Sequence, residues 1–300
     1  MSKVKPVERS TSALQVGSVK QEPFPNIGMH GNLLPGGCHN LNERSKKMNK
    51  INGDESKIVL FSGSKGGCGC SFITYCVSTY LARETTKNIL LLDLNIGKKD
   101  SRLVFNLTDD SYRDLGDIEE VINELDISIL KRLVINFKNS LNLILPPIKI
   151  EKNKIVCKDY LEKFLEVLKE HFDIICIDFP NYLLTQNKMC LRDFVDKIIF
   201  ISLPDLISVN NLNVLANNII YDECSYDFDI LINKFNTRPA ISPAGLNTIL
   251  NYPINAFIPY DRDIEFLILN RGPDSIFNYN LRIVNNISAF SKKIYEDLCI

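Results

Sequence analysis

The segment of this chain whose residue types and spacing point most clearly to a chemical role is glycine-rich and lies between a short apolar run and a helical pattern. The segment reads Gly63-Ser64-Lys65-Gly66-Gly67-Cys68-Gly69-Cys70-Ser71-Phe72. It follows the apolar run 58–61 and leads into a helical pattern that continues to residue 82. Glycines let a backbone approach phosphate oxygens closely, and the amide groups at a helix start point at them. The arrangement predicts a nucleotide-binding loop at 63–71.

The loop departs from the usual pattern at its positive charge. An ordinary phosphate loop ends G-K-[ST], whereas this one ends Gly69-Cys70-Ser71, and the nearest lysine, Lys65, stands at the start of the loop. A charge-assisted hydrogen bond contributes roughly 1.5–3 kcal/mol, so its loss weakens nucleotide affinity without abolishing it. We expect binding through backbone amides, Mg²⁺ and a second lysine, and we do not expect fast hydrolysis.

Two predicted strands end in aspartate, a residue type that supports Mg²⁺. Asp93 closes the apolar run 89–92 and Asp178 closes the run 174–177. Ligands of an open α/β sheet bind outside the carboxyl ends of its strands, so both carboxylates should lie beside the loop. Each aspartate alone is equally suited to capping a turn. Together they favour metal support, with the Ser71 hydroxyl as a further ligand.

Alternating strand-like and helical patterns supply the frame that positions these residues. Strands are expected at 57–62, 88–93, 142–145, 172–177, 197–202, 227–232 and 255–258. Helices are expected near 70–83, 114–124, 159–170, 205–220, 241–250, 261–269 and 279–298. Runs such as 198–201 are apolar on both faces, as parallel strands covered by helices must be. The predicted fold class is α/β: one domain at 56–300 with a doubly wound, mostly parallel sheet and helices on both faces.

Residues 1–55 differ in composition from this domain. Prolines, serines, asparagines and glycines replace the periodic apolar pattern, and nine Lys and Arg stand against five Asp and Glu in residues 1–57. We expect a disordered, polar and basic N-terminal arm, which is either a solvated tail or a tether for a partner or for lipid headgroups.

Composition limits the classes of partner. The net charge of −1 supplies no basic surface for nucleic acid, so no nucleic acid partner is expected. Nine cysteines, an odd number, fit reduced cytosolic thiols better than a disulfide framework. No apolar run reaches the length of a membrane span. The expected location is the cytoplasm, with the inner face of the plasma membrane as a second site.

The loop resembles the deviant Walker A motif, K-G-G-x-G-K-[ST], of the MinD/ParA family of dimeric ATPases. Other matching segments follow in family order: Asp93 after a strand, Asp178-Phe179-Pro180, Asn233-Lys234 and Ile258-Pro259-Tyr260-Asp261. Within the family, the chain is most similar to the CpaE/TadZ-like branch of Flp (type IVb) pilus assembly proteins. That branch has a small residue in place of the final lysine, and its other motifs are similar to Asp93-Leu94-Asn95-Ile96-Gly97 and Pro204-Asp205-Leu206-Ile207-Ser208-Val209.

The resemblance implies roles for the matching positions. Its catalytic positions are Lys65, which would reach the nucleotide of a partner subunit, and Asn95, which replaces an aspartate that orients the attacking water. The Mg²⁺ positions are Ser71, Asp93 and Asp178. The ATP-binding positions are Gly66, Gly67, Cys68, Gly69, Cys70, Ser71, Phe72, Asn233 and Pro259. From the residues alone, Asn233 could pair with a base edge or form an Asx-turn. Losing a general base costs on the order of 10²–10⁴ in rate, so slow or absent ATP hydrolysis is expected.

Three functions stay open at this point. The first is an ATP-dependent homodimer that acts as a positioning scaffold for pilus or secretion assembly proteins, with peripheral membrane association. The second is an active ATPase that cycles on membrane or nucleoid, as division-site and partition relatives do. The third is an interaction module that binds no nucleotide. The apolar stripe of the last helix, Ile287, Phe290, Ile294 and Leu298, is expected to pack on its own domain.

Overall fold

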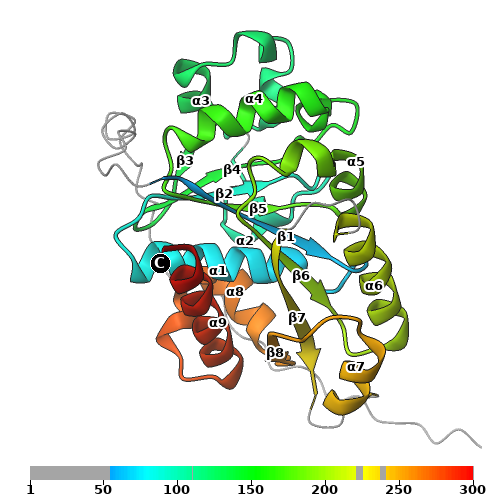
Figure 1. Cartoon of the computed structure of the whole chain (residues 1–300). Helices are drawn as coiled ribbons and strands as arrows, with labels where there is room; N and C mark the ends of the chain where they lie inside the picture. The colour runs from blue at the N-terminus through cyan, green and yellow to red at the C-terminus, as the bar shows by residue number, and fades with distance from the viewer. Residues whose placement is uncertain (1–54, 110, 221–225, 237–240, 300) are drawn as a thin grey trace, which may run out of the picture. The chain divides into compact units, whose positions relative to one another are not determined.

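An eight-stranded sheet forms the centre of the described chain (Figure 1). The computed structural model describes residues 55–109, 111–220, 226–236 and 241–299. These residues all belong to one compact unit, Asn42–Ile300. Apart from Glu55, the predicted N-terminal arm lies outside the described residues.

The strands run in the spatial order β3-β4-β2-β5-β1-β6-β7-β8. Every neighbouring pair is parallel except β3 and β4. This arrangement confirms the predicted doubly wound, mostly parallel sheet. The bounds are β1 Lys57–Gly63, β2 Ile89–Asp93, β3 Ile135–Asn136, β4 Leu141–Ile144, β5 Ile174–Asp178, β6 Lys197–Ser202, β7 Asp227–Phe235 and β8 Ala256–Pro259. The two-residue edge strand β3 was not predicted, because a pairing this short leaves no alternating pattern in the sequence.

Helices cover both faces of the sheet (Figure 1). Their bounds are α1 Cys70–Glu84, α2 Asp100–Val104, α3 Ile127–Leu133, α4 Lys158–Lys169, α5 Asn181–Leu191, α6 Leu206–Ile220, α7 Pro243–Ile249, α8 Ile264–Arg271 and α9 Arg282–Cys299. Four short 3₁₀ turns complete the described elements: η1 Leu115–Ile118, η2 Ile122–Glu124, η3 Lys154–Val156 and η4 Pro273–Asn278.

The prediction of one helix over 114–124 was wrong. Two 3₁₀ turns, η1 and η2, occupy that stretch. The Asp114 carboxylate accepts from the backbone N–H of Gly116, and the Asp117 carboxylate accepts from the backbone N–H of Asp114. These local bonds compete with a continuous helix, and Gly116 further weakens helical propensity.

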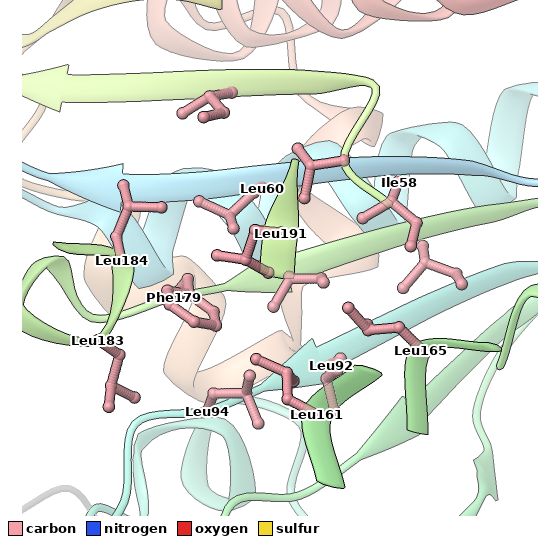
Figure 2. Packing of buried hydrophobic residues seen from close by; sticks show 14 of the residues in the cluster. Ile58, Leu60, Leu92, Leu94, Leu161, Leu165, Phe179, Leu183, Leu184 and Leu191 are labelled. Carbon is pink, nitrogen blue, oxygen red and sulfur yellow. The ribbon is translucent and has the colours of Figure 1, made fainter. Parts of the chain in front are cut away.

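Two apolar clusters hold the layers together. On one face, Ile58, Leu60 and Leu92 pack against side chains of α4 and α5, among them Leu161 and Leu184 (Figure 2). On the other face, the alternate residues of the same strands pack against α1, α8 and α9. Successive residues of a strand point to opposite faces, so the middle of β1, residues 58–61, must be apolar on both faces. Each fully buried aliphatic side chain stabilises the fold by about 1.5–3 kcal/mol.

Helix α9 packs its apolar stripe on the sheet, which confirms that prediction. Ile287, Phe290 and Ile294 are buried, and Leu298 packs against the same cluster. No helix of the described residues has both the length and the apolar character that crossing a membrane requires.

Charged side chains also fasten α9 to the amino ends of β6 and β7. The Lys197 ammonium, buried at 3% exposure, lies 2.7 Å from the Asp227 carboxylate and 3.1 Å from that of Asp297. Lys293 lies 2.9 Å from Asp229. Burial acts to lower the pKa of Lys197, but its hydrogen bonds to Asp227 and Asp297 outweigh that effect and raise it. The helix is therefore held by both apolar contacts and ion pairs.

Candidate functional site

The glycine-rich loop leaves the carboxyl end of β1 and opens α1. Gly67 and Gly69 have φ angles of 78° and 87°, a left-handed conformation that glycine adopts without strain. A Cβ at position 69 would lie 2.3 Å from the side-chain amide nitrogen of Asn233, so only glycine fits there. The strand, turn and helix lie in the arrangement that the sequence predicts for a phosphate loop.

The carboxyl end of β7 braces this loop. The Asn233 side-chain amide donates to the Cys68 carbonyl at 2.9 Å, and the Lys234 ammonium donates to the Gly67 carbonyl at 3.3 Å. Neither the base-edge interpretation nor the Asx-turn interpretation of Asn233 included this buried contact. Sequence reasoning gave Lys234 no role of its own, although its type and its place after a strand were visible signals.

Lys65 forms an ion pair with another residue of the same chain. Its ammonium lies 3.1 Å from the Asp205 carboxylate, and the two side chains are 32% and 39% exposed. Asp205 also accepts from the backbone N–H and the hydroxyl of Ser208, at 2.9 and 2.7 Å. Burial opposes ionisation of Asp205, but the Ser208 donors and Lys65 outweigh it and lower the pKa of this carboxyl. Lys65 can reach another ligand only by leaving Asp205. Because solvent screens this partly exposed ion pair, breaking it costs little free energy.

Two buried carboxylates, Asp93 and Asp178, meet beside the loop. They end the neighbouring parallel strands β2 and β5, where they are partners in register. The Asn95 side-chain amide lies between them, 3.0 Å from one Asp93 oxygen and 2.6 Å from an Asp178 oxygen. A neutral donor between two carboxylates reduces their repulsion, whereas an aspartate at this position would increase it.

Tyr75 completes this acidic cluster from helix α1. Its hydroxyl donates to the second oxygen of Asp93 at 3.0 Å. Burial and the Asp93 charge raise the pKa of Tyr75, so the hydroxyl stays protonated and remains a donor. Sequence reasoning missed this residue. Tyr75 follows Ser71 by one helical turn, which places both side chains on the same face of α1 and was the available signal.

Little positive charge acts on the acidic cluster: burial and Asp93 raise the pKa of Asp178 by more than Lys98 lowers it. Burial and the neighbouring Asp93 raise the pKa of Asp178 to about 7, although hydrogen bonding with Ser71 and Cys70 acts in the opposite direction. A divalent cation beside these carboxylates would favour their ionised forms, and oxygen ligands are those that Mg²⁺ prefers. The residues present therefore fit Mg²⁺ held by Ser71, Asp93 and Asp178, directly or through water.

The two cysteines of the loop are protonated at neutral pH. Burial raises the pKa of the Cys68 thiol and raises that of Cys70 well above its usual range. Cys70 occupies the place of the usual lysine as a small, neutral, weakly donating side chain.

Phe72 and Pro259 lie less directly at the loop. The Phe72 ring packs against the apolar cluster under α1. Pro259 ends β8, and β6 and β7 separate this strand from β1. The predicted contact of Pro259 with adenine stays a prediction.

The raised pKa of Asp178 predicts a specific pH dependence of stability in the metal-free protein. An ordinary unfolded aspartate releases its proton near pH 4, whereas folded Asp178 retains it up to about pH 7. The folded state therefore binds more protons across this window, and the free energy of unfolding falls as pH rises through it. We expect a loss of about 1–2 kcal/mol between about pH 5 and pH 7 in urea titrations.

Asp178→Asn is the matched control for this pH dependence. The variant should lose most of the downward slope, because its amide does not titrate. Equal slopes in the parent and the variant would show that Asp178 ionises normally in the folded protein.

Comparisons with known proteins agree with this geometry. No family model matches the chain. The septum site-determining protein MinD of Thermotoga maritima is 25% identical over 247 residues, which cover 79% of this chain and 87% of that protein. A ParA family ATPase from Chlorobium tepidum matches the structure with a TM-score of 0.69 at 21% identity, over 79% of this chain and 98% of that chain. The chain is similar in sequence to MinD and has the fold of the ParA family ATPase.

A second solved structure with the same fold is MinD complexed with Mg-ADP from Pyrococcus horikoshii. It matches with a TM-score of 0.63 at 17% identity, and the match covers 80% of this chain and 95% of that chain. These relatives confirm the predicted fold. None of the three is a pilus assembly protein, so the CpaE/TadZ-like branch stays a prediction.

Proposed function

We propose that this MinD/ParA-like protein binds Mg-ATP at the loop 63–71 and uses the bound nucleotide to form a homodimer, with little hydrolysis. The observation that carries the proposal is that the glycine-rich loop lies beside two buried acidic side chains, Asp93 and Asp178. The similarity to a MinD solved with Mg-ADP supports the same ligand class here.

The chain's own residues divide the work of binding. The loop backbone holds the phosphates, and Ser71 with the two carboxylates holds Mg²⁺. Bound Mg²⁺ would supply positive charge to offset the negative phosphates. Since Cys70 cannot supply an ammonium, affinity should be lower than in relatives that have lysine at this position.

Slow hydrolysis follows from the use of Asn95. Its amide donates to both carboxylates, and an amide does not accept a proton as a carboxylate does. A missing phosphate-binding lysine also removes charge stabilisation from the transition state. Both departures act in the same direction.

The face around Lys65 is suited to a second subunit. A pocket of about 330 Å³ lies between α5 and α6 and is lined in part by Ser64 and Asn211. Several large apolar side chains of α5 and α6 are exposed on these helices: Tyr182, Leu206, Ile207 and Val214. Burying these side chains between two subunits would stabilise a dimer. In that dimer, Lys65 would leave Asp205 and bind the partner's nucleotide.

Dimerisation with Mg-ATP tests the proposal directly. Sedimentation velocity should show a larger dimer fraction for the parent with Mg-ATP than without it. Lys65→Ala should weaken the dimer at least tenfold, because a charge-assisted contact to phosphate contributes roughly 1.5–3 kcal/mol. Asp205→Asn should strengthen it, since asparagine still caps α6 but no longer holds Lys65.

Two results would count against this mechanism. A monomer fraction of the parent that Mg-ATP leaves unchanged would rule out the nucleotide-dependent dimer. A Lys65→Ala protein that dimerises like the parent would leave the dimer possible and remove Lys65 from its mechanism.

For the cellular role, the relatives favour division-site or partition-like positioning, whereas the slow hydrolysis proposed for this chain fits a scaffold that does not cycle. The named relatives are a septum site-determining protein and a ParA family ATPase. The pilus scaffold is the second candidate, and its support is the segment 204–209, whose Asp205 contacts the loop through Lys65. A phosphate-release assay separates the two, because a cycling ATPase requires steady turnover and a scaffold does not.

A further inference from the structure

Lys234 presents a second ammonium group to the phosphate loop from outside it. Its nitrogen lies 3.3 Å from the Gly67 carbonyl, and its Cε would lie 3.9 Å from a Cβ at Gly69. The side chain is exposed, so a ligand at the loop can reach it. Lys65, at the other side of the loop, is already paired with Asp205.

Two features of strand β7 direct Lys234 toward the loop. The pairing of β7 with β8 shifts register between Ile232 and Phe235, and Lys234 has a φ of 52°. A bulge re-aims the side chains of its strand, and bulges are frequent next to active sites. A left-handed conformation at a residue other than glycine is strained, and such residues cluster at functional sites. The neighbouring Asn233, anchored on the Cys68 carbonyl, keeps this bent strand against the loop.

An ammonium group beside the loop would improve the charge balance of the site. Asp93 and Asp178 are buried acidic groups beside the loop, and Cys70 provides no positive charge. An ammonium has three N–H donors. Among the described residues, the Lys234 ammonium has the Gly67 carbonyl as its hydrogen-bond partner, which leaves donors for a ligand.

We propose that Lys234 supplies the positive charge to the nucleotide phosphates that a lysine at position 70 would otherwise supply. This inference rests on the proposed binding of Mg-ATP. The ammonium keeps or exchanges its contact with the Gly67 carbonyl and binds phosphate oxygens beside it. The loop thus recovers from another strand the charge that its own sequence lacks.

Calorimetric titration of the full chain with Mg-ATP tests the assignment. Lys234→Met keeps a long side chain and removes the charge, and it should weaken binding about tenfold or more. Lys234→Arg keeps the charge and should stay within about threefold of the parent. The control is Lys292→Met, at a 67% exposed lysine of α9, and it should bind like the parent.

A second pair of variants separates charge from loop support. In a Cys70→Lys background the loop has its own ammonium, so adding Lys234→Met should cost about threefold or less. An equal loss in both backgrounds would show that Lys234 only supports the loop and would overturn the assignment. A parent that binds Mg-ATP and a Lys234→Met variant that binds it equally well would overturn it too. A parent without measurable binding would overturn the proposed function and this inference together.

Discussion

The double variant Cys70→Lys, Asn95→Asp is expected to hydrolyse ATP on the order of 10²-fold faster than the parent, or more. Lysine at 70 restores a positive charge at the phosphates, and aspartate at 95 restores a group that can orient water and accept a proton. Phosphate release measured with saturating Mg-ATP gives the rate directly.

The single variants make this prediction specific. Cys70→Lys alone should tighten Mg-ATP binding about tenfold with little gain in rate. Asn95→Asp alone replaces the donor between Asp93 and Asp178 by a third carboxylate, so the metal-free protein should lose stability and Mg²⁺ should restore it. A double variant that remains as slow as the parent would place the cause of slow turnover outside these two positions.

Gly69→Ala should reduce Mg-ATP affinity at least a hundredfold, because it changes both the backbone and the brace of the loop. An alanine at φ 87° is strained by about 1–2 kcal/mol, and its Cβ would lie 2.3 Å from the Asn233 amide nitrogen. The Asn233 side chain must then move away from the Cys68 carbonyl, which removes its hydrogen bond to the loop. Equilibrium titration with a fluorescent ATP analogue measures the loss.

Gly272→Ala is the matched control for this loss. Gly272, after α8, has a φ of 80°, and a Cβ there would meet nothing within 4 Å. With a ψ of 160°, Gly272 has a conformation that other residues rarely adopt, so this variant should lose about 1–3 kcal/mol of stability and keep its nucleotide affinity. If Gly69→Ala binds as tightly as the Gly272 variant, the contact between Asn233 and the loop does not determine affinity.

The sheet and the loop were predictable because their signals are local. Strand β6 is apolar on both faces at 198–201, and the glycine spacing of 63–71 lies between a strand and a helix. Helix α5 was missed, because polar residues interrupt its apolar face and the 3.6-residue period is weak.

The contacts of the site were not predictable, because they join residues far apart in sequence. Asn95 reaches Asp178 across 83 positions, and Lys65 reaches Asp205 across 140. The position of Lys234 depends on a register shift in β7, which only the three-dimensional pairing of the strands reveals. Sequence identified the residue types, and the fold determined which of them touch.

The fastening of α9 has a consequence for how this protein could associate with lipid. An amphipathic helix binds a bilayer by inserting its apolar face among the acyl chains. Here Ile287, Phe290 and Ile294 are already committed to the interior, and Lys293 is committed to Asp229. Detaching α9 would expose the apolar cluster beneath it to water and break those ion pairs. Membrane binding through this helix would therefore reduce the stability of the folded domain.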